Sequence, residues 1–126
     1  MNNYKNLLVW KKSIDLVVMA YQATDKFPDK EKFALTTQIN RSAVSIASNI
    51  AKGAGRNSEK EFRHFLGIVT GSMYELETQL IIANKLNYID NSNLTAIIEL
   101  LTEIQKMTAS LIRSLQTKDS LLTTKD

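Results

Sequence analysis

The sequence predicts an all-α protein, an antiparallel up-down four-helix bundle, and three observations support this fold class. The 126 residues include one proline, Pro28, and four glycines, so long stretches run without a helix breaker. Four segments repeat apolar residues at intervals of three and four, which is the period of one helix face. The connections between these segments are short, so consecutive helices are expected to be antiparallel neighbours. One domain is expected at residues 1–116, followed by a flexible C-terminal tail at residues 117–126.

The first two helices are separated by the proline. The first helix is expected to end near residues 25–27, because Pro28 disfavours helical geometry at the residue before it. The second is expected to begin at residues 28–31, since proline suits the first helical turn, and to end at Gly53 and Gly55. The stripe predicted to be buried on the first helix is Leu7, Trp10, Ile14, Val17 and Tyr21. That on the second is Leu35, Ile39, Ala43, Ile46 and Ile50.

The third helix has the clearest period in the chain. Ser58 and Glu61 form a capping-box pattern, in which each side chain satisfies the backbone N–H of the other. The apolar residues that follow are spaced close to every 3.5 residues, a pattern typical of near-parallel helix packing. They are Phe62, Leu66, Val69, Met73, Leu76, Leu80 and Ala83.

The fourth helix is expected after the cap-rich loop at residues 90–93. Its predicted stripe is Leu94, Ile97, Leu101, Ile104, Thr108, Leu111 and Leu115. Further apolar residues fall outside the four stripes, where they either widen the core or seal contacts between subunits. They include Leu16, Val18, Phe65, Ile68, Ile81 and Ile98.

Small residues on the second and third helices predict a close approach of two backbones. Gly67 and Gly71 lie four residues apart, and a glycine inside a helix costs roughly 1 kcal/mol relative to alanine. Close packing of these two helices, or of two subunits, would offset that cost. The second helix carries its own small residues at the same spacing, Ala43, Ala47 and Ala51.

The composition excludes several classes of function. The absence of cysteine excludes disulfides, thiolate metal sites and cysteine nucleophiles, and it fits a reducing cytoplasm. No apolar run approaches the ~20 residues that span a bilayer, so no membrane partner is expected. His64 is the only histidine and sits in a charged turn, which favours a surface residue over a catalyst or a zinc ligand. We therefore expect a cytoplasmic, non-enzymatic protein with no cofactor and no metal.

Basic residues gather around the turn between the second and third helices. The net charge is +3, and residues 1–63 hold 11 Lys and Arg against 6 Asp and Glu. The N-terminus of the third helix adds positive partial charge, which favours phosphate groups. The cluster is interpreted as a phosphate-contacting surface, and the alternative is an ordinary solvated corner. The candidate nucleic-acid-binding residues are Lys11, Lys12, Lys52, Arg56, Lys60 and Arg63.

Residues 9–84 resemble the four-helix bundle proteins encoded by intervening sequences in bacterial 23S ribosomal RNA genes, which are related to the accessory variability determinant proteins of diversity-generating retroelements. The resemblance rests on Val9-Trp10-Lys11-Lys12, Phe27-Pro28 and Gln38-Ile39-Asn40-Arg41. It rests further on Ser45-Ile46-Ala47-Ser48-Asn49-Ile50-Ala51-Lys52-Gly53 and on Gly71-Ser72-Met73-Tyr74-Glu75-Leu76-Glu77-Thr78.

The resemblance implies a four-helix bundle that assembles into a ring-like homopentamer. In the retroelement relatives it also implies a positive surface that binds RNA or DNA and a reverse transcriptase as partner. The chain departs from the family pattern at Asn40, where an arginine is common, at Ala47-Ser48, where a proline is often seen, and at Lys52, where a glutamate is frequent. Four polar residues match the pattern and are expected to be polar groups of the bundle interior, with a ligand site as the alternative. Glu75 either points inward, with Arg41 as a candidate partner, or is simply exposed. They are Arg41, Ser45, Asn49 and Glu75.

Overall fold

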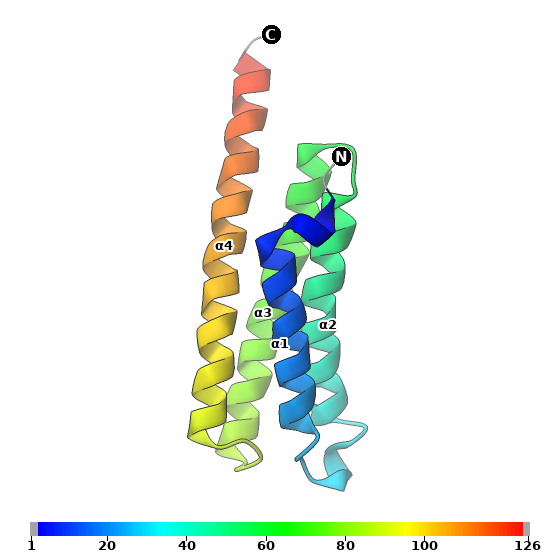
Figure 1. Cartoon of the computed structure of the whole chain (residues 1–126), viewed down its shortest axis with the longest axis vertical. Coiled ribbons are helices and arrows are strands. Elements are labelled where there is room, and N and C mark those ends of the chain that lie inside the picture. Colours follow the sequence, from blue (N-terminus) through cyan, green and yellow to red (C-terminus); the bar gives the residue numbers. More distant parts are fainter. Residues whose placement is uncertain (1–2, 125–126) are drawn as a thin grey trace.

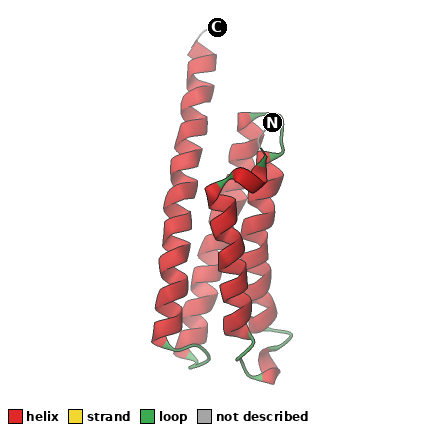
Figure 2. Ribbon diagram, in the orientation of Figure 1, coloured by secondary structure: helices red, strands yellow, loops and turns green. Residues whose placement is uncertain are grey.

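The computed structural model describes residues 3–124, and side chains as far as residue 116. Four α-helices form the bundle: α1 (Leu8–Thr24), α2 (Leu35–Ala54), α3 (Glu59–Lys85) and α4 (Asn91–Thr124). Two 3-10 helices precede α1 and α2, at Tyr4–Asn6 (η1) and Asp29–Glu31 (η2). The described residues contain no strand, so the all-α prediction is confirmed (Figures 1 and 2).

The helices run up and down in sequence, and each packs against two others. α1 packs against α2 and α4, and α3 packs against the same two helices. Within residues 3–124, α1 makes no packing contact with α3, nor α2 with α4, so these pairs lie on the diagonals of the bundle. The α1–α2 and α3–α4 connections therefore share one end of the molecule, and the α2–α3 turn lies at the other (Figure 1).

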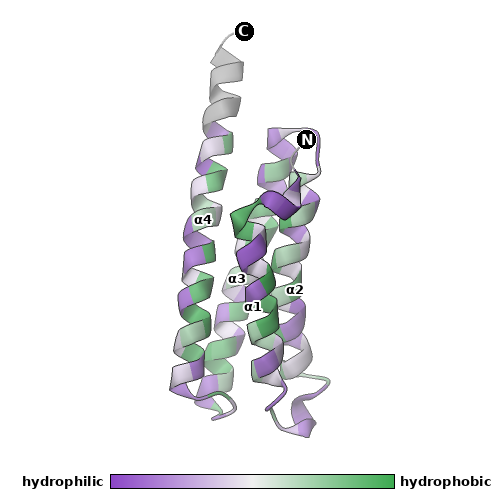
Figure 3. Cartoon of the chain, in the orientation of Figure 1, coloured by the Kyte–Doolittle hydropathy of each residue, from purple (hydrophilic) through white to green (hydrophobic). Residues whose placement is uncertain are grey.

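The core is built mainly from the stripes predicted for α2, α3 and α4. Every predicted residue of the α3 stripe is buried, and so are the α2 residues from Ile39 to Ile50 in that stripe. In α4, Leu94 and Leu111 are half-buried and the other members are buried. Polar and apolar residues are interleaved along every helix, as a bundle with one buried face per helix requires (Figure 3).

The stripe predicted for α1 is confirmed only in part, because the helix is apolar on two faces. Leu7, Trp10 and Val17 are half-buried against the core, but the other two members are exposed. Ile14 is 38% exposed and Tyr21 is half exposed, whereas Leu16 is completely buried together with Val9 and Ala20. The remaining buried positions are polar. The Ser13 hydroxyl donates to the Trp10 carbonyl (2.6 Å), and the Thr24 hydroxyl bonds Asn40 Oδ1 at 3.0 Å. Hydrogen-bonded hydroxyls can be buried at little cost, so a face that looks partly polar in sequence faces the core.

α2 begins later than predicted. Residues 29–31 form η2, a turn follows, and α2 starts at Leu35 rather than at residues 28–31. Glu31 is used to join the two connections at this end: its carboxylate accepts from the Tyr88 hydroxyl at 2.8 Å and from the Leu35 N–H at 3.4 Å. The hydrogen bond to Glu31 also raises the pKa of the Tyr88 phenol. Phe27 packs beside the Tyr88 ring, with centroids 5.5 Å apart.

The other helix ends follow local rules. Ser58 Oγ accepts from the Glu61 N–H at 3.0 Å and caps α3, and Asp90 Oδ1 caps α4 by accepting from the Asn93 N–H at 2.7 Å. Asn87 ends α3 with a φ of 64°, the left-handed conformation that asparagine tolerates best after glycine. α4 continues to Thr124, so the backbone of residues 117–124, part of the predicted flexible tail, is helical. Residues 125–126 lie outside the described part of the chain.

The close packing predicted at Gly67 and Gly71 is absent within the chain. Both are exposed, and a Cβ atom added at either would meet nothing within 4 Å. The close approach of α2 to α3 occurs instead at Gly53, which is buried. A Cβ there would lie 2.8 Å from Phe65 Cβ and 2.9 Å from Phe62 Cδ1.

Candidate nucleic-acid interface

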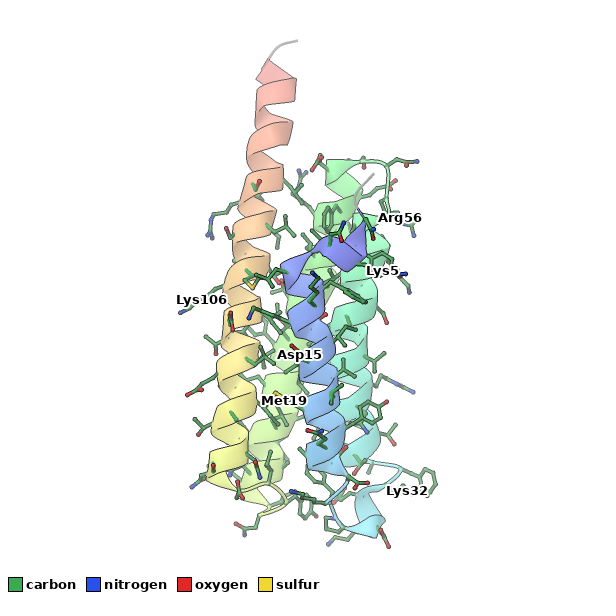
Figure 4. The ribbon with its side chains drawn as sticks, viewed as in Figure 1. Lys5, Asp15, Met19, Lys32, Arg56 and Lys106 are labelled. Carbon is green, nitrogen blue, oxygen red and sulfur yellow. The ribbon has the colours of Figure 1, made fainter. Side chains whose placement is uncertain are left out.

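The end of the bundle that carries the α2–α3 turn exposes four cationic side chains, which we call the basic end. Lys52 lies in the last turn of α2, Arg56 in the connection, and Lys60 in the first turn of α3. η1 packs against α2 and places Lys5 at the same end as Arg56 (Figure 4). The basic end therefore consists of Lys5, Lys52, Arg56 and Lys60, all exposed.

Lys5 was missed by the sequence reasoning. It precedes the first apolar stripe, and only the packing of η1 on α2 brings it to the basic end. The signal available in the sequence is Asn3, whose side chain accepts from the Lys5 N–H at 3.1 Å and caps η1.

Arg56 is held over an aromatic ring. Its guanidinium carbon lies 4.9 Å from the centroid of Phe65, a cation–π distance. The Cβ atom of the same phenylalanine stands against Gly53, beside the ring of Phe62. Packing between α2 and α3 therefore orients the one arginine of the basic end.

Two of the predicted phosphate contacts have structural roles. Arg63 is half-buried and donates to the backbone carbonyl of Leu115 at 3.3 Å, which ties α3 to α4. Lys12 forms an ion pair with Glu103 at 2.9 Å, which joins α1 to α4. Both cations therefore have partners within the bundle, and their contact with nucleic acid stays a prediction. Lys11 is exposed on α1.

Acidic residues moderate the charge of this end. Glu59 and Glu61 occupy the first turn of α3, where carboxylates stabilise the helix dipole. Ser58 already uses one of the free N–H groups there. The positive charge consequently comes from side chains more than from the helix terminus.

Two of the four family-pattern polar residues form a network at the α2–α3 seam. Ser45 Oγ lies 2.9 Å from Ser72 Oγ, and the Asn49 side-chain amide donates to the Ser45 carbonyl and hydroxyl at 2.9 and 3.1 Å. Arg41 and Glu75 are exposed, and in the described residues they form no ion pair with each other. Of the two orientations open to Glu75 in the sequence, the structure has the exposed one, since its position on α3 faces away from the core.

The side chains of residues 3–116 provide no assembled metal site: no group of three or more histidine or acidic side chains is close enough to hold an ion. His64 is exposed, with its ring 5.6 Å from the Phe65 centroid in an edge-on arrangement. Over the described residues, none of the helices is long and apolar enough to cross a membrane.

Apolar side chains remain exposed on the outer surfaces of two diagonal helices. On α1 they are Leu8, Ile14, Val18 and Tyr21. On α3 they are Ile68, Tyr74, Ile81 and Ile82, and the exposed Gly67 and Gly71 are on that helix too. Because α1 and α3 are diagonal, these two surfaces face opposite sides of the bundle.

The fold and the basic end together define the class of protein: a small antiparallel four-helix bundle with cations at one end and uncovered apolar surface on its sides. The chain belongs to the 23S rRNA-intervening sequence protein family, whose model matches residues 5–110. It is similar to a crystal structure of a protein of unknown function from the S23 ribosomal protein family of Bacteroides thetaiotaomicron. The two share 28% identity with a TM-score of 0.75, over 83% of this chain and 98% of the other. No protein with a curated description matches the chain.

Proposed function

We propose that the protein is a non-enzymatic, homo-oligomeric accessory protein of the cytoplasm that binds the backbone of RNA or DNA through its basic end. The observation that carries the proposal is the gathering of Lys5, Lys52, Arg56 and Lys60 at one end, all exposed. Lys11 extends the cationic surface along α1. Lysine and arginine side chains that contact phosphates bind without reading bases, so the binding is weakly sequence-specific.

The homo-oligomer is proposed to be a ring-like pentamer. The exposed apolar surfaces of α1 and α3 support association, because contiguous uncovered apolar surface marks interaction sites. Two different surfaces on opposite sides of one chain support head-to-tail contacts, which form a ring when the rotation between successive copies closes. Five copies, and a reverse transcriptase as partner, follow from the family resemblance alone.

The Lys52→Glu/Arg56→Glu variant should bind structured RNA and duplex DNA more weakly than the parent protein. Removing one cation that neutralises a phosphate reduces the slope of log affinity against log salt by roughly 1, so the double variant should have a slope smaller by about two units. The measurement is binding of nuclease-treated protein to both nucleic acids across a salt series. Arg63 is left intact, since it bonds Leu115 and its replacement would perturb the fold.

The matched control reverses two exposed cations at the opposite end, Lys26→Glu/Lys85→Glu. It changes the net charge by the same amount, and it should retain most of the affinity and the slope. Equal reductions of affinity in the two double variants would refute a localised basic end and indicate a diffuse charge effect.

The assembled protein should have a mass close to five times the 14.2 kDa of one chain. Light scattering across micromolar concentrations measures this directly. A monomeric mass throughout that range contradicts the homo-oligomer, and a stable mass of another multiple contradicts the pentamer.

The second candidate function is a structural or protein-partner-binding helical module with no role in nucleic-acid binding. The exposed surface of α3 favours it, since Tyr74 and Ile82 offer an aromatic and an aliphatic contact on the helix that carries two exposed glycines. Absence of nucleic-acid binding at low salt, together with a single protein partner retained after nuclease treatment, would support this alternative.

A further inference from the structure

Phe33 is the most exposed large hydrophobic side chain among those described. It is 89% exposed, in the turn between η2 and α2. Lys30 and Lys32 precede it and are exposed, and the Lys32 amine lies 5.7 Å from the Phe33 ring. The turn therefore presents an aromatic knob with cations around it. Neither the core nor the basic end uses this knob.

A groove on the opposite side of the bundle has the complementary chemistry. It lies between the C-terminal half of α3 and the start of α4 and has a volume of about 480 Å³. Its apolar floor comes from Ile81, Leu94 and Ile98, and Glu77 and Glu99 contribute carboxylates to its lining. Gln105 donates to the Glu77 carboxylate at 3.3 Å, which fixes one side of the groove.

The knob and the groove lie at the same end of the molecule. The hydrogen bond from the Tyr88 hydroxyl to Glu31 joins the α3–α4 connection to η2, two residues before Phe33. The two features nonetheless face different sides: Lys32 projects on the side away from α4, and α2 does not contact α4 in the described residues (Figure 4). A knob and a socket at one level on opposite sides of one chain are suited to a head-to-tail contact between copies. Such a contact repeats around a ring when the rotation between copies closes.

We propose that Phe33 of one copy inserts into the α3–α4 groove of the next copy. Charge complementarity supports this occupant, since Lys30 and Lys32 would face the carboxylates of Glu77 and Glu99. Of the two acidic residues beside these lysines, Glu31 is bonded to Tyr88 and Asp29 is exposed. An aromatic anchor in an apolar pocket is the usual hot spot of an interface. The inference rests on the homo-oligomer of the proposed function and specifies where its subunits touch.

Disulfide trapping tests the contact, because the chain has no cysteine of its own. Ala34→Cys is carried on a tagged chain and Thr95→Cys on an untagged chain, so that Phe33 and the groove floor are unchanged. Both positions are exposed, and Thr95 lines the groove. After co-expression and mild oxidation, the expected product is one disulfide-linked pair containing a tagged and an untagged chain.

The control replaces Thr95→Cys by Ser110→Cys, an exposed position farther along α4 and outside the groove. It should give no mixed pair. If the protein is oligomeric but no disulfide forms between positions 34 and 95, the contact between Phe33 and the groove is overturned and the homo-oligomer stands. The same holds if Thr95→Cys and Ser110→Cys are trapped equally. A monomeric parent protein overturns both proposals.

Phe33→Ser provides a second measurement that does not depend on oxidation. The variant should raise the dissociation constant of the oligomer by roughly 30-fold or more, as removal of an anchor does. At the same low protein concentration, the variant and the parent should have equal helix content and equal unfolding midpoints. The Phe33 side chain is solvent-exposed in the single chain, so its loss should not affect folding. Phe33→Leu keeps an apolar knob and should preserve assembly. Unchanged assembly in Phe33→Ser contradicts the inference.

Discussion

Leu16→Ala should lower the free energy of unfolding by about 2–5 kcal/mol. Leu16 is completely buried in α1, and truncating a leucine in a close-packed core removes apolar contacts and leaves a cavity. Thermal or denaturant unfolding of the purified protein, at a concentration where its oligomeric state is known, measures the decrease. No larger single-residue effect on stability is expected among the variants proposed for this chain.

Ile14→Ala is the matched control on the same helix. Ile14 belongs to the stripe that the sequence predicted to be buried, yet it is 38% exposed. Its truncation should cost about 1 kcal/mol or less in the single chain, since only part of the side chain leaves an apolar environment. A larger decrease for Ile14→Ala than for Leu16→Ala would place the other face of α1 against the core.

Gly53→Ala should destabilise the protein by about 1–3 kcal/mol, although alanine is the better helix former. The new Cβ would lie 2.8 Å from Phe65 Cβ and 2.9 Å from Phe62 Cδ1. Phe65 Cβ is fixed to the α3 backbone, so relief requires α2 and α3 to move apart, and overpacking of this kind costs energy. Denaturant unfolding measures the effect, and the Arg56–Phe65 stacking should be disturbed as well.

Gly67→Ala should have the opposite sign. A Cβ at Gly67 meets nothing within 4 Å, so the substitution should stabilise α3 by roughly 0.5–1 kcal/mol in the single chain. Weaker assembly of this variant, read by light scattering, would place Gly67 in a subunit contact. Destabilisation by both substitutions, with assembly unchanged, would contradict the packing described for α2 and α3.

The candidate site could be located from the sequence only in part. Lys52, Arg56 and Lys60 were found because they flank one turn, and the turn itself was marked by two glycines and a serine cap. The sequence also predicts Arg63 and Lys12 on this surface, because it shows their charges but not their hydrogen-bond and ion-pair partners. Their partners are Leu115 and Glu103 on α4, which are far away in sequence and close only after folding.

The sequence by itself determined the four helices, their order and three of the four buried stripes. These features depend on local rules: the apolar period of α3, the Ser58 and Asp90 caps, and connections too short to allow parallel neighbours. Only the tertiary structure decided which face of α1 is buried, because residues 7–21 carry two apolar faces and hydrogen bonds to Trp10 and Asn40 allow Ser13 and Thr24 into the core. It also decided where two backbones meet closely, at Gly53 rather than at Gly67, since that depends on Phe62 and on the Cβ atom of Phe65, both on the facing helix. Periodicity identifies faces that are suited to burial, and the choice between two such faces is made by the helices that pack against them.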